Sequence, residues 1–371
     1  MTKTTLSNPT ASNDNILGRQ IAFAAAFLLP TAKLLEAPSI LAKHAAGDLL
    51  VPALLHFILQ AGVLFLLHFA ASRAEKSLFE RLNEVLGKGA AVFYLFFSIF
   101  YIYTAILPLL DLEKFVYAAF FDTAPTVFAF GFFFFLSAFI CSKGIKSIGR
   151  AADLCIFLFV LPFLALIAMS LGSTDFSQLL PLLGTKFGHT MSAFKYSTPH
   201  FSDAVLLLPL IGNLKHKKGD TAKIMIGYSV GAFFTLLFLA VFFGVYSSIA
   251  PREHYAFSKI AQYFPALNIL GRVDLVFVYL LTIVLMFYTC LPLQYATDLT
   301  CNTLHIKQKA VFSAILNFLL FLFVLFCNKY YNTFYSLISR KIPFVFWFIA
   351  DMLPLFLLLL PKKSNRRSTH A

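Results

Sequence analysis

The chain has 371 residues, of which 59% are hydrophobic and only 13% are charged, and its mean hydropathy is +0.80. A soluble fold of this size could not keep so much apolar surface away from water, and a disordered chain would be far more polar. The composition therefore indicates a membrane protein with several spans. The net charge of +13 would suit a nucleic-acid-binding protein. However, the basic residues lie in short segments between apolar runs, so no nucleic acid is expected as a partner.

Apolar runs of about 20 residues, the length that crosses a bilayer, occur ten times along the chain. They cover residues 20–42, 49–70, 90–112, 125–142, 151–172, 190–213, 224–248, 274–296, 309–327 and 342–361. Each run is expected to be a helix, because every backbone polar group in lipid must be satisfied within the protein. The sequence thus predicts an all-α membrane protein. It has a polar N-terminus at 1–16, a ten-helix transmembrane domain at 17–361 and a basic tail at 362–371.

The distribution of Lys and Arg predicts the orientation. If the N-terminus is cytoplasmic, 19 of these residues fall in inside segments and 9 in outside segments, as the positive-inside rule requires. Both termini are therefore expected in the cytoplasm. Segment 251–272 mixes charged and apolar residues and is too polar to span, so we expect an amphipathic helix on the outer membrane surface there.

Two of the predicted spans contain proline beside ionisable residues. In the first, Pro30 and Pro38 bracket Lys33 and Glu36; in the sixth, Pro199 lies between Lys195 and Asp203. Proline interrupts a helix, and freed backbone groups at such breaks bind polar solutes in transporters. The interrupted spans hold matching positions in the two halves, about 17–172 and 186–361, which is typical of an inverted repeat.

The predicted solute site lies between these two breaks. Its candidate residues are Lys33, Glu36, Tyr196, Ser197, His200 and Asp203. Lys33 or backbone amides would bind an anionic group, and Glu36 or Asp203 would bind an amine. Alternatively, Lys33 and Glu36, three residues apart on one helix face, pair with each other and only hold the bundle together. Lys195 and His200 could also lie at the outer interface.

Other polar residues within the runs allow weaker predictions. His56, Gln60 and His68 share one face of the second run, which suits interhelical hydrogen bonds better than a proton relay. Asp351 stands alone in the tenth run and should face the interior, where a cation from another helix is one candidate partner. The remaining acidic residues near the run ends are expected at the membrane interface; they are Asp111, Glu113, Asp122, Asp153 and Asp298.

Signatures of enzymes and cofactors are absent from the sequence. It has no Gly-rich phosphate loop and no nucleophile motif, and its five cysteines are scattered without a Cys-x-x-Cys pair. We therefore expect neither an enzyme nor an ATPase, and no cofactor, metal site or disulfide framework.

Five short motifs carry a family resemblance. They are Arg19-Gln20 before the first run, Pro38 followed by Gly47-Asp48, Asp122-Thr123-Ala124-Pro125 at the start of the fourth run, Gly144-Ile145-Lys146-Ser147-Ile148-Gly149-Arg150 before the fifth, and Gly271-Arg272-Val273-Asp274 before the eighth. In this order they resemble the B-subunit family of spore germinant receptors, which belongs to the amino acid–polyamine–organocation transporter superfamily. The resemblance extends from about residue 16 to residue 361.

The resemblance implies a ten-helix bundle of two inverted five-helix repeats, with a small amino-acid-like ligand between the breaks of helices 1 and 6. It also implies an A and a C subunit as partners in the bacterial spore inner membrane, and a part in spore germination. The chain departs from the family at the first break, where the stretch 31–37 has no glycine and two charges. Two alternatives therefore stay open: a stand-alone proton-coupled amino acid or amine transporter of the same fold, or a structural subunit with a vestigial pocket.

Overall fold

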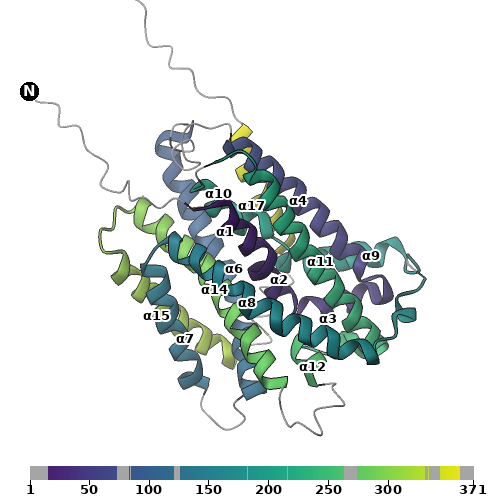
Figure 1. Ribbon diagram of the computed structural model, residues 1–371. Coiled ribbons are helices and arrows are strands. Elements are labelled where there is room, and N and C mark those ends of the chain that lie inside the picture. Colours follow the sequence, from purple (N-terminus) through teal and green to yellow (C-terminus); the bar gives the residue numbers. More distant parts are fainter. Residues whose placement is uncertain are drawn as a thin grey trace, which may run out of the picture.

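The computed structural model (Figure 1) describes residues 16–359 apart from 73–82, 84, 121–125, 182, 215, 263–273, 331–332 and 334–342. The predicted polar N-terminus, apart from Ile16, and the predicted basic tail therefore lie outside the described residues, as do the motif at 122–125 and most of the motif at 271–274. The elements of the described part are all helices. An isolated β-bridge also joins Ile16 and Leu214.

The first half of the chain forms one interrupted helix and four long helices. In order, the elements are α1 (Gly18–Phe23), the π-helix η1 (Ala24–Leu28), α2 (Leu29–Lys33), α3 (Ala37–Ala45), η2 (Ala46–Asp48), α4 (Leu50–Ser72), η3 (Gly87–Gly89), α6 (Ala90–Phe120), α7 (Thr126–Ser142) and α8 (Ile145–Ser170). The short helices η4 (Leu171–Ser173) and η5 (Phe176–Leu179) lead into the second half.

The second half also begins with an interrupted helix. Its elements are α9 (Phe187–Ser197), η6 (Thr198–His200), α10 (Asp203–Gly212), α11 (Asp220–Tyr246), η7 (Ser247–Arg252), α12 (Ala256–Gln262), α14 (Asp274–Thr303), α15 (Lys309–Lys329) and α17 (Pro343–Leu359). Each of the ten predicted runs thus coincides with a helix or with a broken helix pair.

Six of the described helices are long and apolar enough to cross a membrane. They are Leu50–Ser72, Ala90–Val116, Ile145–Ser173, Asp220–Arg252, Leu275–Thr303 and Lys309–Cys327. A seventh span results if the bent pair Gly18–Lys33 and Ala37–Asp48, whose axes differ by 63°, counts as one. The chain is therefore a multi-pass membrane protein, in agreement with the composition.

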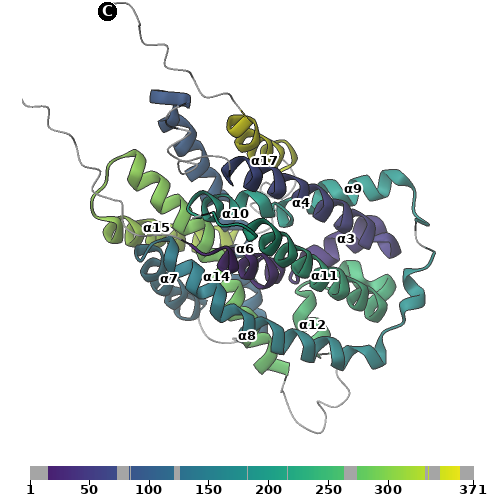
Figure 2. The ribbon, with the colours of Figure 1, turned by 45° about the horizontal axis from the view of Figure 1, so that its top comes forward.

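Helices from the two halves pack against one another in matching pairs. Helix α3 lies along α9, α4 along α11, α6 along α14, and α7 along α15, and the last pair stands at one side of the bundle in both views (Figures 1 and 2). The broken first helix runs through the centre, where α1 and η1 contact both α8 and α11. This central position places its break inside the protein rather than at the lipid surface.

Burial modifies two expectations about segment ends. In segment 251–272, residues 251–252 end η7 and residues 256–262 form the short helix α12, in which five of seven residues are buried against the bundle. Residues 263–272 lie outside the described residues. Asp111 and Glu113, which hydropathy placed at the end of a span, are buried in the protein, and α6 continues past them to Phe120.

Candidate functional site

The break of the first helix lies at Leu34–Glu36. Helix α2 ends at Lys33, and Pro38 occupies the first turn of α3, where its missing N–H costs nothing. The carbonyl groups of Leu34 and Leu35 accept hydrogen bonds from the backbone N–H groups of Phe257 (3.1 Å) and Ala256 (2.9 Å). These donors open helix α12 and would otherwise lack partners. The segment that begins α12 therefore covers the break and donates hydrogen bonds to its carbonyl groups.

The break of the sixth helix lies at Thr198–Ser202. Helix α9 ends at Ser197, the short helix η6 contains Pro199, and α10 starts at Asp203. The backbone N–H of Ala204, one of the free donors at the start of α10, donates to Oε1 of Gln60 at 2.9 Å. A side chain of α4 thus caps α10, the second half of the broken sixth helix.

A buried ion pair joins the two breaks. Nζ of Lys33 lies 2.6 Å from Oδ1 of Asp203, and the two side chains are only 2% and 3% exposed. Lys33 is the last residue of α2 and Asp203 the first of α10, so each charge also has the sign that the nearby helix dipole favours. Nζ of Lys33 donates further to the carbonyl oxygen of Leu29 (3.2 Å), and the hydroxyl of Tyr228 donates to Oδ2 of Asp203 (3.0 Å).

Aromatic rings enclose the ion pair. The rings of Phe201 and Phe57 lie with their centroids 5.6 and 6.0 Å from Nζ of Lys33. Such rings stabilise an ammonium group through their quadrupole while excluding water. Because the pair is buried away from water, either partner would be costly to leave without the other.

Helix α4 connects this centre to α17 and to α9, the first half of the broken sixth helix. The side-chain amide of Gln60 donates to Oδ2 of Asp351 at 3.0 Å. The sequence allowed a cation as the partner of this aspartate, but the partner found here is an amide. Nε2 of His56 lies 3.0 Å from Oγ of Ser197, and Nδ1 of His68 lies 3.0 Å from Oγ1 of Thr221. The three polar side chains on this face of α4, His56, Gln60 and His68, therefore make hydrogen-bond contacts with other helices.

Glu36 does not pair with Lys33. The helix is interrupted between the two residues, so their side chains do not lie on one helix face. The carboxylate of Glu36 instead lies 2.9 Å from Nδ1 of His254, just before α12; the Glu36 side chain is 5% exposed and that of His254 is 64% exposed. This contact reinforces the backbone hydrogen bonds by which the start of α12 covers the break. The hydrogen bond with Glu36 raises the pKa of His254, against a smaller opposing effect of burial.

This contact predicts a pH dependence. Since the folded protein raises the pKa of His254 above 6.5, the contact stabilises fully below that ordinary value and is lost as the pH rises through the raised value. We expect His254→Gln to lower the melting temperature at pH 5.5 and to have a much smaller effect at pH 9. Thermal unfolding in detergent at both values measures this, with His305→Gln as the control. An equal loss at both values would show that the contact does not involve a protonated imidazole.

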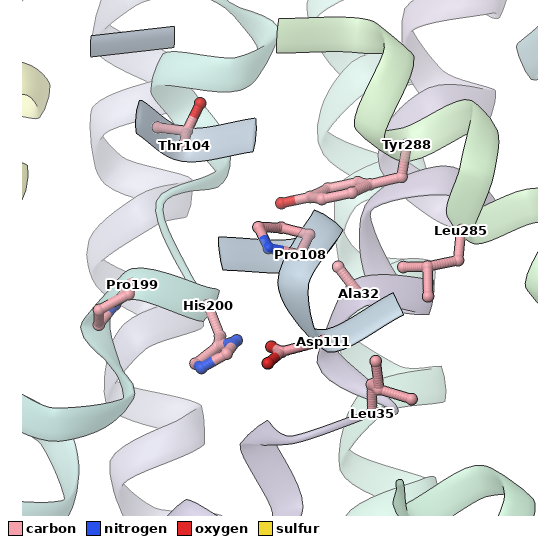
Figure 3. A pocket seen from close by; sticks show the side chains of 9 residues that line it. All are labelled: Ala32, Leu35, Thr104, Pro108, Asp111, Pro199, His200, Leu285 and Tyr288. Atoms are coloured by element: carbon pink, nitrogen blue, oxygen red, sulfur yellow. The ribbon is translucent and has the colours of Figure 1, made fainter. Parts of the chain in front are cut away.

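A small cavity of about 20 Å³ lies beside the two breaks (Figure 3). Its walls come from α2, α6, η6 and α14, and the lining residues are Ala32, Leu35, Thr104, Pro108, Asp111, Pro199, His200, Leu285 and Tyr288. Figure 3 shows the imidazole of His200 and the carboxylate of Asp111 pointing toward each other across it. This volume suits about one water molecule, so the structure is a closed form in which a larger solute would need the walls to part.

The six predicted site residues separate into groups. Lys33 and Asp203 form the central pair, His200 lines the cavity, and Ser197 contacts His56. Glu36 contacts His254, just before α12. The ring of Tyr196 stacks on His44 of α3, with centroids 4.6 Å apart, and so joins α3 and α9; neither residue lines the cavity.

The sequence analysis missed two residues of this centre. Tyr228 gave no signal in the sequence, because a single tyrosine in an apolar run is common. Asp111 was noticed, but its burial was not predicted. Among the described residues, no group of three or more His, Cys, Asp or Glu side chains is arranged to hold a metal ion.

Comparison with known protein families gives a match over most of the chain. A family model described as "Spore germination protein" matches residues 20–333, a range that includes both breaks and the ion pair. No curated protein matches the chain.

Proposed function

The chain belongs to the spore germination protein family, a family of membrane permeases, and on that premise we propose that it is the solute-binding subunit of a spore germinant receptor. In this proposal it holds a small amino-acid-like germinant between the breaks of helices 1 and 6 and takes part in spore germination. The observation that carries the proposal is the dry Lys33–Asp203 pair, at 2.6 Å, between the ends of two half-helices. A rigid structural helix pair would need no such break, whereas a solute site uses one.

The proposed architecture has ten transmembrane helices in two inverted repeats, about 17–172 and 186–361. The packing of α4, α6 and α7 on α11, α14 and α15 supports it, because a pseudo-two-fold axis brings corresponding helices together. Both termini would lie in the cytoplasm, since this orientation puts most Lys and Arg on the inside. The membrane would be the bacterial spore inner membrane, with receptor A and C subunits as partners.

The test is a thermal-shift screen of the purified full chain in detergent against amino acids, amines and nucleosides. A ligand at 100 times its dissociation constant should stabilise the protein by about 2.7 kcal/mol. Ala32→Leu, which pushes a larger side chain into the cavity, should remove the response while the protein stays folded. Ala91→Leu, on the exposed face of α6, is the matched control and should respond like the parent.

The screen also separates the alternatives. A stand-alone transporter would accumulate the stabilising ligand in proteoliposomes that contain this chain alone, with a proton gradient as the driving force. A structural subunit with a vestigial pocket would show no saturable shift with any compound. Either result would contradict the receptor-subunit proposal in its present form.

A further inference from the structure

Two buried histidine nitrogens near the end of α4 have no hydrogen-bond partner among the described residues. They are Nε2 of His68, on α4, and Nδ1 of His216, in the segment that joins α10 to α11. The two rings lie edge to face, with centroids 5.0 Å apart and planes at 79°. A buried nitrogen without a partner costs free energy, and in native proteins such atoms commonly mark a bound ion or water.

A hydrogen bond fixes the orientation of the His68 ring. Its Nδ1 lies 3.0 Å from Oγ1 of Thr221, in the first turn of α11, and the residue is only 2% exposed. When Nδ1 donates its proton to this hydroxyl, Nε2 keeps its lone pair. Metal-binding histidines have this arrangement, because the hydrogen bond of the second ring nitrogen sets the tautomer and the direction of the ring.

The spacing of the two rings matches that of two imidazoles bound to one metal ion. A zinc–nitrogen bond of about 2.1 Å places the ion about 3.2 Å from each ring centroid, and the tetrahedral angle then separates the two centroids by about 5.3 Å. The observed separation of the His68 and His216 rings is 5.0 Å. Ordinary edge-to-face packing gives a similar distance, but it leaves both nitrogens unpaired.

The charges around the pair bear on how tightly a cation would bind. Asp220, the first residue of α11, is buried and attracts positive charge toward both imidazoles. Its carboxylate already accepts the backbone N–H of Lys217 (2.9 Å) and lies 3.4 Å from Nζ of Lys223, so it contributes charge rather than a metal bond. We therefore expect two protein ligands, with water completing the coordination from the partly exposed side of His216.

We propose that Nε2 of His68 and Nδ1 of His216 bind a divalent transition-metal ion of the zinc class. Imidazole suits zinc, copper and nickel, whereas magnesium and calcium prefer oxygen ligands. The proposal departs from the sequence-based expectation of no metal site. That expectation relied on local spacing, and these two ligands come from separate elements. The inference goes beyond the proposed function and does not depend on it.

A metal ion at this position would tie α4 to the second half of the broken sixth helix. The segment that contains His216 follows α10, whose first residue is Asp203, and precedes α11, which carries Tyr228. The ion would therefore hold the helices that position Asp203 and Tyr228 in the closed arrangement. Because it binds the folded protein, it should also raise the melting temperature.

The test adds zinc chloride to the purified full chain, without a histidine tag and in detergent. Isothermal titration calorimetry should show one zinc ion per chain, thermal unfolding should show a higher melting temperature, and magnesium chloride should produce neither effect. His68→Gln and His216→Gln should each weaken zinc binding about 10-fold or more, because one imidazole is left. His189→Gln, at an exposed histidine of α9, is the matched control and should bind zinc as the parent does.

A thiol variant separates metal binding from ring packing. His216→Cys should bind zinc again, because thiolate is a good zinc ligand, and with cobalt(II) it should show a sulfur-to-metal charge-transfer band. Zinc binding by this variant without such a band with cobalt(II) would place the metal elsewhere and overturn the proposal. So would the lack of stoichiometric zinc binding in folded parent protein, or an unchanged zinc affinity in His216→Gln. If buried His68→Gln does not fold, the variants of the partly exposed His216 decide the question.

Discussion

Replacing Lys33 by methionine should destabilise the protein by about 3–5 kcal/mol, because it leaves the buried carboxylate of Asp203 without its cation. Asp203 is 2% exposed and keeps only the hydroxyl of Tyr228 as a hydrogen-bonding side chain. Methionine has nearly the shape of the lysine stem, so packing against Phe57 and Phe201 changes little. The loss therefore reports the charge rather than a cavity, and chemical or thermal unfolding in detergent measures it.

Two further variants test this explanation. The double variant Lys33→Met with Asp203→Leu removes both charges and should recover most of the lost stability, since a buried ion pair can be replaced by apolar residues at little cost. Lys309→Met breaks the more exposed pair with Asp298, 3.3 Å apart, and should cost no more than about 1 kcal/mol. Equal losses in Lys33→Met and Lys309→Met would show that the central pair is not effectively buried.

The ion pair also illustrates what the sequence could and could not predict. Proline next to ionisable residues located both breaks, because few other patterns interrupt an apolar run of that length. The sequence did not identify the partner of Lys33. Local spacing favoured Glu36, three residues away, but the break removes the helical geometry that this spacing assumes, and the true partner lies 170 residues along the chain.

Burial within the bundle was the second quantity that local sequence did not determine. Asp111 follows the apolar part of its run, so hydropathy placed it at the interface. The helix continues to Phe120, and the surrounding helices bury the side chain. Hydropathy averages over a window of residues, whereas burial depends on what packs around each one. Tyr228 was missed for the same reason, since its partner becomes visible only when α11 is placed against α10.

Substituting the two glycines of α11 that face the first helix should be the next most damaging change. A Cβ atom at Gly227 would lie against the carbonyl oxygen of Ala22, and one at Gly231 against that of Ala25. Because backbone atoms cannot turn aside as a side chain can, α11 itself must move away. We expect Gly227→Ala and Gly231→Ala each to cost about 1–3 kcal/mol, and the double variant to cost more than either, as measured by unfolding in detergent.

Gly62 of α4 is the matched control, since a Cβ atom there would meet nothing within 4 Å. Gly62→Ala should change stability by no more than about 1 kcal/mol. The glycine variants should also weaken the ion pair, because Tyr228 directly follows Gly227 and its hydroxyl reaches Asp203 only while α11 stays close. A double-mutant cycle between Gly227→Ala and Tyr228→Phe should therefore give less than the sum of the single losses. Strict additivity would mean that the close approach of α11 and the Tyr228–Asp203 hydrogen bond are independent, and that these glycines do not help to position the site.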